Sequence, residues 1–186
     1  WRMTREDAGA LLKQYVKNER MLNHCYASEA VMRALARKLG QDEEKWAITG
    51  LLHDIDIELV DGDLSRHCLE AETILKEKGV DPEIIDAILI HNEIAAGRKR
   101  ETVMQHALAA GETITGLIVA TTLVYPDKKL ASVKPKSVVK RMKEKAFAAS
   151  VNRDNIMECE TIGIPLNEFA ELCITAMNGI SDQLGL

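Results

Sequence analysis

The sequence predicts an all-α fold, and three observations support this prediction. Aromatic residues make up only 4% of the 186 residues, so the core must consist mainly of Leu, Ile, Val, Ala and Met. These side chains suit packed helices better than sheets. Apolar residues recur at helical spacing between capping signals, with no strand-rich block, repeat or low-complexity linker. A chain of this length favours one domain, over residues 1–186.

Helical signals begin near the N-terminus. Thr4 stands three residues before Asp7 and can cap a first helix. A second helix is predicted over 19–39 and should end at Gly40, because glycine tolerates the left-handed backbone found after helix C-termini. A third helix can begin after Asp42 and end near 53–56. The second helix therefore carries His24, and the third ends at the adjacent pair His53 and Asp54.

Two shorter helices are predicted next. The fourth covers 64–78, which places His67 in its first turn. Asp81 followed by Pro82 can start a fifth helix that leads into His91, because proline is favoured at the first helical position. Both helices bring a histidine to one of their ends.

The second half of the chain begins with a polar stretch over 93–102. A long helix is then predicted over 102–125, where small and apolar residues form a stripe beside Glu112. The basic segment 134–147 is predicted to be helical and to precede a turn at 151–154. Pro165 opens a last amphipathic helix.

Charge and cysteine usage limit the function classes. The formal net charge of −5 provides no global basic field, so we expect no long nucleic acid as the main partner. The four cysteines include no CxxC pair and are expected to be reduced thiols. The longest apolar stretch, 114–125, is shorter than the roughly 20 residues of a membrane span, and no leader peptide is apparent. These features predict a cytoplasmic protein that does not bind membranes.

Histidines and carboxylates are distributed over the predicted helices in an ordered set. This set consists of His24, His53, Asp54, His67, His91 and Glu112. Imidazole nitrogen and carboxylate oxygen are suitable ligands for Fe, Mn, Co, Ni or Zn, and Mg is also allowed. A metal ion would offset the cost of burying Glu112 beside an apolar stripe. Taken singly, His67 could be a surface residue, and His91 could be a cation favoured at a helix C-terminus.

The local motif LLHDID, over 51–56, together with the upstream His24, resembles the signature H…HD…D of the HD superfamily. The resemblance covers roughly residues 20–129. It implies an HD-type helical bundle of about seven to nine helices, with 130–186 as a helical extension. Within that extension, 137–154 is similar to the C-terminal part of small HD proteins that share the HDID form.

The resemblance also implies a ligand set. His24, His53 and Asp54 would bind a metal, and Asp54 would bridge two ions if two are bound. Glu112 stands where the family has its final Asp, and its extra methylene shifts the carboxylate. His67 and His91 match additional histidines of HD relatives that bind a second metal or position a phosphate, such as diadenosine-tetraphosphate hydrolases and HD-GYP phosphodiesterases. Asp54, His67 and His91 are thus also the predicted catalytic residues.

The function that this resemblance implies is metal-dependent hydrolysis of a small phosphoester, with nucleotides as the natural class, by attack of a metal-activated water. The enzyme would be a phosphomonoesterase or phosphodiesterase with one or two ions. Asp54, or a neighbouring carboxylate such as Asp56 or Glu58, could orient the nucleophile. Cations that could bind the phosphate include Arg66, Arg98, Lys136, Lys140 and Arg153, although the basic run in 134–153 also fits a solvated helix face.

Two alternatives remain open at this point. Some HD-fold proteins with the extra histidines hold two irons and oxidise a small organic substrate, and the ligand order here permits that reaction. A non-catalytic HD binding module is the other alternative. It would have lost activity through Glu112 and through the absence of the lysine that often follows the pair, since the chain reads HDIDIELVDG. The sequence indicates no oligomeric state.

Overall fold

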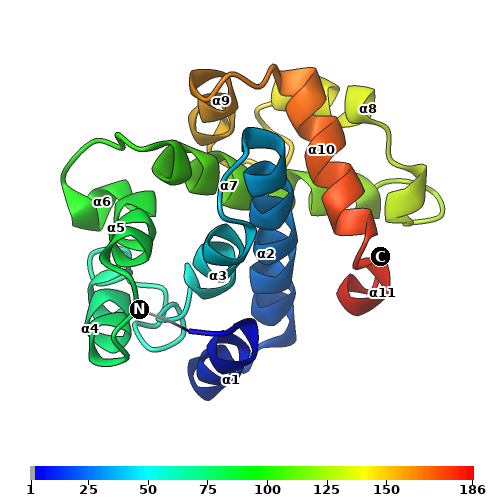
Figure 1. Cartoon of the computed structure of the whole chain (residues 1–186). Coiled ribbons are helices and arrows are strands. Elements are labelled where there is room, and N and C mark those ends of the chain that lie inside the picture. The colour runs from blue at the N-terminus through cyan, green and yellow to red at the C-terminus, as the bar shows by residue number, and fades with distance from the viewer. Residues whose placement is uncertain (1–2) are drawn as a thin grey trace.

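The computed structural model describes residues 3–186, and the all-α prediction is confirmed for them (Figure 1). Eleven α-helices lie within this range, somewhat more than the predicted seven to nine, because three short or unexpected helices (α6, α9 and α11) add to the set. The elements are α1 Arg5–Tyr15, α2 Glu19–Leu39, α3 Glu43–Leu52, α4 Leu69–Glu77, α5 Pro82–His91, α6 Glu93–Ala96, α7 Val103–Leu123, η1 Leu130–Ser132, α8 Pro135–Met142, α9 Arg153–Thr161, α10 Leu166–Asn178 and α11 Ser181–Leu184.

The starts of α1 and α3 and the end of α2 lie where the capping residues predict, whereas α3 ends at Leu52, just before the predicted 53–56. The Thr4 hydroxyl accepts a hydrogen bond from the amide of Asp7, and the Asp7 carboxylate accepts one from the amide of Thr4, which forms a capping box. Gly40 ends α2 in the left-handed conformation, with φ of 67°. The Asp42 side chain caps α3. These caps fix the positions of α2 and α3 along the chain.

The fourth helix is shorter than predicted, because α4 begins at Leu69 rather than at residue 64. Cys68 has a left-handed backbone, with φ of 78°, which interrupts the helical path immediately before Leu69. The chain from 53 to 68 instead forms successive turns. His67 therefore lies in this turn segment and not in the first turn of a helix.

The C-terminal region also differs from the prediction. The helix expected over 134–147 ends at Met142, and the turn expected at 151–154 is the start of α9. The guanidinium group of Arg153 stabilises the connection between α8 and α9. It donates hydrogen bonds to five main-chain carbonyl groups, those of Arg141, Glu144, Phe147, Ala148 and Val151.

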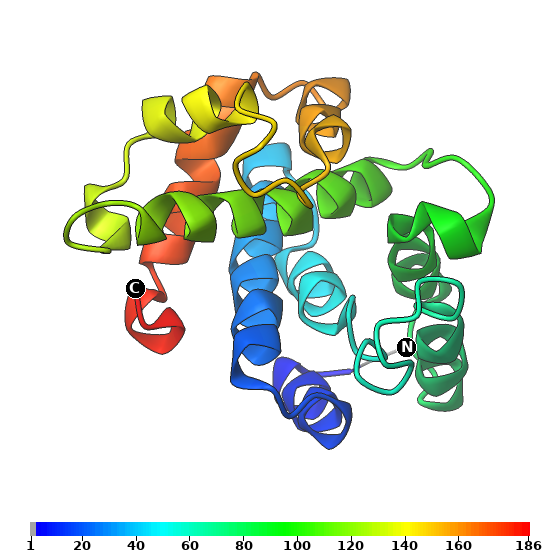
Figure 2. The ribbon, with the colours of Figure 1, turned by 180° about the vertical axis from the view of Figure 1, so that it is seen from behind.

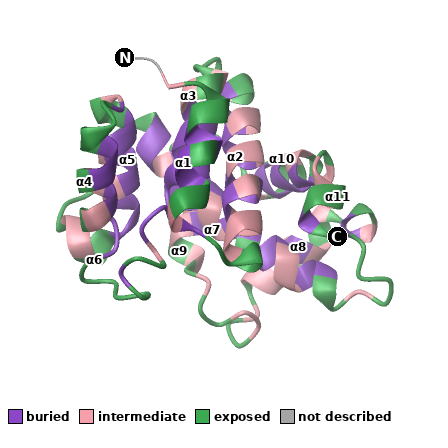
Figure 3. Ribbon diagram, turned by 90° about the horizontal axis from the view of Figure 1, so that it is seen from below, coloured by how far each residue is buried: buried purple, intermediate pink, exposed green. Residues whose placement is uncertain are grey.

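The helices are arranged around α2 and α7. α7 runs across α2, as Figures 1 and 2 both show, and it also packs against α5, α8, α9 and α10. α3 lies against α2, α1 and α5, and α4 covers the outer side of α5. Buried residues follow α5 and the inner sides of α1 and α2, whereas exposed residues follow the outer sides of α1 and α4 (Figure 3). One continuous apolar core extends from Ala8 to Leu184.

α7 is longer than the apolar stretch expected from the sequence. By length and composition alone it could cross a membrane, and it is the one such helix within residues 3–186. However, 61% of its most apolar window is buried inside the protein. This burial is what the core helix of a globular protein shows, and it is consistent with a soluble protein.

Two glycines allow helices to approach α2 closely. A Cβ atom added to Gly50 on α3 would lie 2.5 Å from the carbonyl oxygen of Ser28 on α2. One added to Gly111 on α7 would lie 3.0 Å from Cγ1 of Val31. Because there is no side chain at either position, the backbones of α3 and α7 come close to α2. The neighbours of these glycines include His53 and Glu112.

We predict that Gly50→Ala and Gly116→Ala have different effects on stability. The alanine at position 50 would clash with main-chain atoms and should lower the free energy of unfolding by about 1–3 kcal/mol. A Cβ at Gly116, also inside α7, would meet only Cγ2 of Val151, at 3.8 Å, so that alanine should be neutral or stabilise by up to about 1 kcal/mol. Urea unfolding measures both changes. Equal destabilisation by the two variants would contradict this account of the helix contacts.

Candidate metal centre

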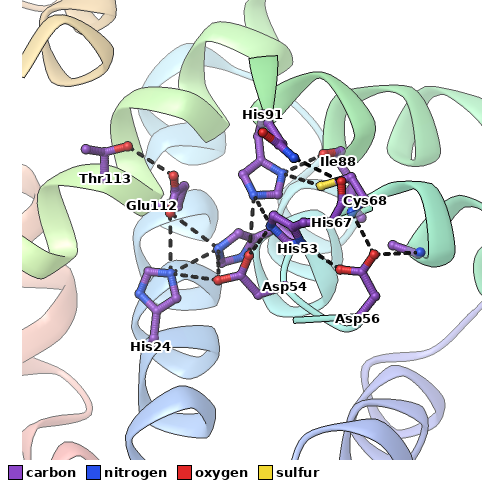
Figure 4. Close-up of polar contacts among 12 residues, drawn as sticks. His24, His53, Asp54, Asp56, His67, Cys68, Ile88, His91, Glu112 and Thr113 are labelled. Carbon is purple, nitrogen blue, oxygen red and sulfur yellow. Dashed lines mark hydrogen bonds and ion pairs between the residues drawn. The ribbon is translucent and has the colours of Figure 1, made fainter. Parts of the chain in front are cut away.

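Side chains from five parts of the chain meet between α2, α3, α5 and α7 (Figure 4). α2 and α7 each contribute one residue, α3 contributes the residue at its C-terminus, α5 contributes its last residue, and the turn segment contributes two. They are His24, His53, Asp54, His67, His91 and Glu112. The structure therefore brings together the whole set of ligands expected from the sequence.

The carboxylate of Asp54 lies between two pairs of imidazoles. Its Oδ2 atom is 3.3 Å from Nε2 of His24 and 3.3 Å from Nε2 of His53. Its Oδ1 atom is 3.0 Å from Nε2 of His67 and 3.3 Å from Nε2 of His91. One carboxylate oxygen thus faces each pair, which is how a carboxylate that bridges two metal ions is arranged.

Glu112 joins the pair formed by His24 and His53. Its Oε2 atom lies 3.3 Å from Nε2 of His24 and 3.5 Å from Nε2 of His53. The other oxygen, Oε1, accepts a hydrogen bond of 3.0 Å from the hydroxyl of Thr113. The side chain of Glu112 is therefore long enough to reach both imidazoles of this pair.

Main-chain carbonyl groups fix the orientation of two imidazoles. Nδ1 of His53 lies 2.7 Å from the carbonyl oxygen of Gly50, and Nδ1 of His91 lies 2.5 Å from that of Ile88. A carbonyl can only accept, so both Nδ1 atoms carry the proton and donate. The Nε2 atoms of both rings are consequently directed at Asp54 and available as ligands.

The other two imidazoles are oriented by side chains. The hydroxyl of Thr115 donates to the carbonyl oxygen of Glu112 at 2.7 Å, so it accepts from Nδ1 of His24 at 3.1 Å. Nδ1 of His67 donates to Oδ1 of Asp56 at 2.6 Å. In all four rings Nδ1 therefore carries a proton and Nε2 faces the centre.

The convergence of the four Nε2 atoms fits a metal ion. Nε2 of His24 and Nε2 of His53 are 3.0 Å apart, and those of His67 and His91 are 3.3 Å apart. Lone pairs this close repel each other unless a cation or a proton lies beside them. Imidazole nitrogens combined with carboxylate oxygens form a donor set that binds divalent transition metals. The groups whose ligand atoms lie close enough for one ion are His24, His53 and Glu112; His53, Asp54 and His91; and His67, Cys68 and His91.

In the ion-free protein, protons occupy the places that an ion would take. Burial by itself lowers the pKa of a histidine, but hydrogen bonds with Asp54 and Glu112 raise the pKa of His24 to about 10. Burial also lowers the pKa of His67, but hydrogen bonds with Asp54 and Asp56 raise this pKa to about 12. The imidazoles in turn hold the pKa of Asp54 well below its usual range, although burial opposes this.

Asp56 supports the cluster from outside it. Its carboxylate is fully buried and accepts hydrogen bonds from Nδ1 of His67 at 2.6 Å and from the amides of Cys68 at 2.6 Å and Ala71 at 3.0 Å. The amide of Ala71 belongs to the first turn of α4, so Asp56 fixes both the start of this helix and the ring of His67. Asp56, which the sequence suggests as a possible orienting group for the nucleophile, is thus engaged by three hydrogen bonds within the protein.

Two further residues have roles other than those expected. Glu58, also suggested as an orienting group, accepts hydrogen bonds from the amides of Lys17 and Asn18 between α1 and α2. Sγ of Cys68 lies 3.4 Å from Nδ1 of His91, a contact that sequence reasoning missed. The only sequence signal for this contact is that Cys68 directly follows His67. No motif distinguishes Cys68 from an ordinary core cysteine.

The cluster is open to solvent on one side only. The side chains of His24, Glu112 and Asp54 are 24%, 17% and 11% exposed. Those of His67 and His91 are 5% and 6% exposed, and that of His53 is fully buried. A small molecule would therefore reach the centre past His24 and Glu112.

The cations predicted to bind phosphate lie elsewhere. Within residues 3–186, none of them hydrogen-bonds to a side chain of the cluster. Arg66 contacts Glu70, Arg98 contacts Asp86, and Arg153 donates to the carbonyls described above. Lys136 and Lys140 lie on α8, which packs mainly against α10 and α7.

The part of the chain that carries the cluster matches a known protein family. The HD domain model matches residues 21–121, just over half of the chain. The chain belongs to the HD domain family. A tRNA (cytidine(56)-2'-O)-methyltransferase of Thermoplasma volcanium is 28% identical over 149 residues, which are 77% of this chain and 42% of the methyltransferase. The chain thus spans less than half of that relative's length. Among solved structures, none gives a significant match.

We predict that this HD domain releases protons when it binds a divalent ion. Because the pKa values of His24 and His67 are raised to about 10 and about 12, both rings are protonated at neutral pH, and an ion must displace these protons. Affinity for Mn²⁺ should therefore rise between about pH 6 and 9. Titration calorimetry in buffers of different ionisation enthalpy counts the released protons, and an affinity independent of pH would contradict the prediction.

Proposed function

We propose that this HD domain protein is a metal-dependent phosphohydrolase that acts on a small phosphoester. The observation that carries the proposal is the position of Asp54, with one oxygen toward each pair of imidazoles. Two ions held about 3.5–4 Å apart are typical of enzymes that hydrolyse phosphoesters. Nucleotides are the first substrates to test. The methyltransferase relative is named for a different reaction, and its name supplies no substrate here.

The proposed ligands form two groups. His24, His53, Glu112 and one oxygen of Asp54 would hold one ion, and His67, His91 and the other oxygen of Asp54 would hold the second. Bound divalent ions would bring the pKa of a water toward neutrality and offset negative charge on the phosphoryl oxygens. Fe, Mn, Co, Ni and Zn suit the donor set, and Mg would be a weaker match to the imidazoles.

His67 and His91 were expected to be catalytic, and the geometry supports a narrower role. The Nδ1 atom of each ring donates to Asp56 or to a main-chain carbonyl, and each Nε2 atom faces Asp54. Neither side chain is on the open side of the cluster. We therefore propose that both act as ligands, that Asp54 acts as the bridge, and that Asp56 is a positioning residue for His67.

The proposal also covers the setting in which the protein acts. The net charge of −5 supports a small phosphorylated substrate rather than a long nucleic acid. All four cysteines are free and buried, which supports a reducing compartment such as the cytoplasm. The burial of α7 supports a protein that does not act in a membrane.

We predict that two carboxylate substitutions change the number of bound ions differently. Asp54→Asn alters the one group that faces both pairs of imidazoles, so it should reduce bound metal from two ions to fewer than one. Glu112→Gln alters only the group with His24 and His53, so about one ion should remain. Elemental analysis of the purified variants after dialysis measures the ratio. Equal loss in both variants would argue against separate half-sites.

We predict that the protein, loaded with Mn²⁺, Co²⁺ or Ni²⁺, releases phosphate or an alcohol from at least one member of a panel of nucleotides, phosphomonoesters and phosphodiesters. His53→Ala should remove turnover and the ion held with His24 and Glu112, so that about one ion remains. His106→Ala is the matched control, because this imidazole contacts Glu158 and lies outside the cluster.

Other results of this panel would support other functions. Bound iron with consumption of oxygen and no hydrolysis would favour an oxygenase, since four imidazoles with carboxylates also suit iron. Retained metal with neither activity would favour a binding module. Turnover that persists in His53→Ala would refute the proposed site.

A further inference from the structure

A cavity of about 540 Å³ adjoins the open side of the cluster and lies between α2 and α7, next to the segment 184–186. His24 and Thr115, which contacts Nδ1 of His24, are part of its wall, so the cavity meets the cluster at its most exposed residue. Most of the remaining wall is aliphatic, as its members include Ala27, Val119, Ala120, Leu123 and Leu184. We call this cavity the α2/α7 groove.

The exposure of the cluster agrees with the position of the groove. His24 is the most exposed side chain of the six, and it is the one that lines the groove. His67 and His91 lie on the other side of Asp54, at Oδ1, and His53 is fully buried behind His24. A molecule that binds the centre from solvent would therefore extend into the groove.

Gly116 keeps part of the groove open. It lies in the interior of α7, where glycine costs about 1 kcal/mol relative to alanine. Packing explains Gly50 and Gly111, where a Cβ would come within 3.0 Å of a neighbouring atom, but not Gly116, which is exposed and has ordinary contact distance to Val151. A side chain at position 116 would instead project into the groove beside Thr115.

Arg20 supplies positive charge to the same groove. It precedes His24 by one helical turn, so both side chains lie on one face of α2 and both line the groove. Within residues 3–186, no hydrogen bond or ion pair engages its guanidinium group, whereas Arg66 and Arg98 are paired with Glu70 and Asp86. No motif in the sequence distinguishes Arg20 from other surface arginines.

We propose that the α2/α7 groove binds the organic group of the phosphoester, that this group is largely apolar, such as an aryl ring, and that Arg20 contacts the negatively charged part of the substrate. This inference rests on the proposed function, because it places the phosphoryl group at the metal cluster. Aliphatic walls provide contact area without a pattern of hydrogen bonds, so they favour apolar groups over sugars.

The test compares two probes, phenylphosphonate and methylphosphonate, by titration calorimetry on the Mn²⁺-loaded protein. Phenylphosphonate should bind the wild-type protein more tightly, because only its ring reaches the groove. Gly116→Leu should raise the ratio of the phenylphosphonate to the methylphosphonate dissociation constant by at least about tenfold, which corresponds to lost burial of one apolar group. Gln14→Leu, on the exposed side of α1, adds the same side chain outside the groove and should leave this ratio unchanged.

A second variant tests the charge. Arg20→Gln should weaken both probes by a similar factor, because Arg20 is proposed to contact the phosphonate and not the ring. Metal content and thermal unfolding confirm that each variant is folded and loaded. Equal affinity of the wild-type protein for the two probes, or an unchanged ratio in a folded Gly116→Leu variant, would overturn the inference.

Turnover separates this inference from the proposed function. If the wild-type protein hydrolyses 4-nitrophenyl phosphate and methyl phosphate but Gly116→Leu affects both alike, the groove assignment is wrong and the hydrolase proposal stands. If neither ester is hydrolysed in any metal form while Gly116→Leu still selectively weakens phenylphosphonate, the groove assignment stands and phosphoester hydrolysis loses its support.

Discussion

The contact of the Asp54 carboxylate with four imidazoles is the interaction on which the rest of the structure depends. The four rings come from α2, α3, the turn segment and α5, and each Nε2 atom lies within 3.3 Å of an Asp54 oxygen. A buried carboxylate is costly unless cations or donors surround it. The helices must therefore converge on this one side chain, and the small residues Gly50 and Gly111 make that convergence sterically feasible.

The outer hydrogen bonds determine what the cluster can bind. Each Nδ1 atom donates to a carbonyl, a hydroxyl or a carboxylate. The Nε2 atom of each ring is therefore the one that binds a proton or an ion. The pKa of His24 is raised for the same reason, because without an ion a proton on this ring provides the positive charge beside the two carboxylates. Proton release and metal binding are consequently linked through the same nitrogen atoms.

The sequence was informative where the local signal was strong. Capping residues such as Thr4 and Asp42 predicted the starts of helices, and the order of histidines predicted which side chains would meet. The start of α4 could not be predicted, because it depends on the buried carboxylate of Asp56, which binds the amides of Cys68 and Ala71 across the turn segment. Tertiary contacts of this kind leave no periodic pattern.

The cations illustrate the same limit. Arg153 looked suitable for a phosphate by charge alone, yet its partners are carbonyl groups made available by the end of α8. Arg20 carried no motif, and only the groove beside His24 makes it notable. Charge in a sequence shows which residues could bind an anion, whereas the competing acceptors around each residue decide which ones are free to do so.

The two halves of the cluster differ in how carboxylate charge reaches them. The half with His24 and His53 faces two carboxylates directly, Asp54 and Glu112. The half with His67 and His91 faces Asp54 alone, but Asp56 acts on it through the ring of His67. A carboxylate bonded to Nδ1 makes the opposite nitrogen a stronger donor to a metal. Two carboxylates therefore act on each half, and the indirect one serves the half that is closed to solvent.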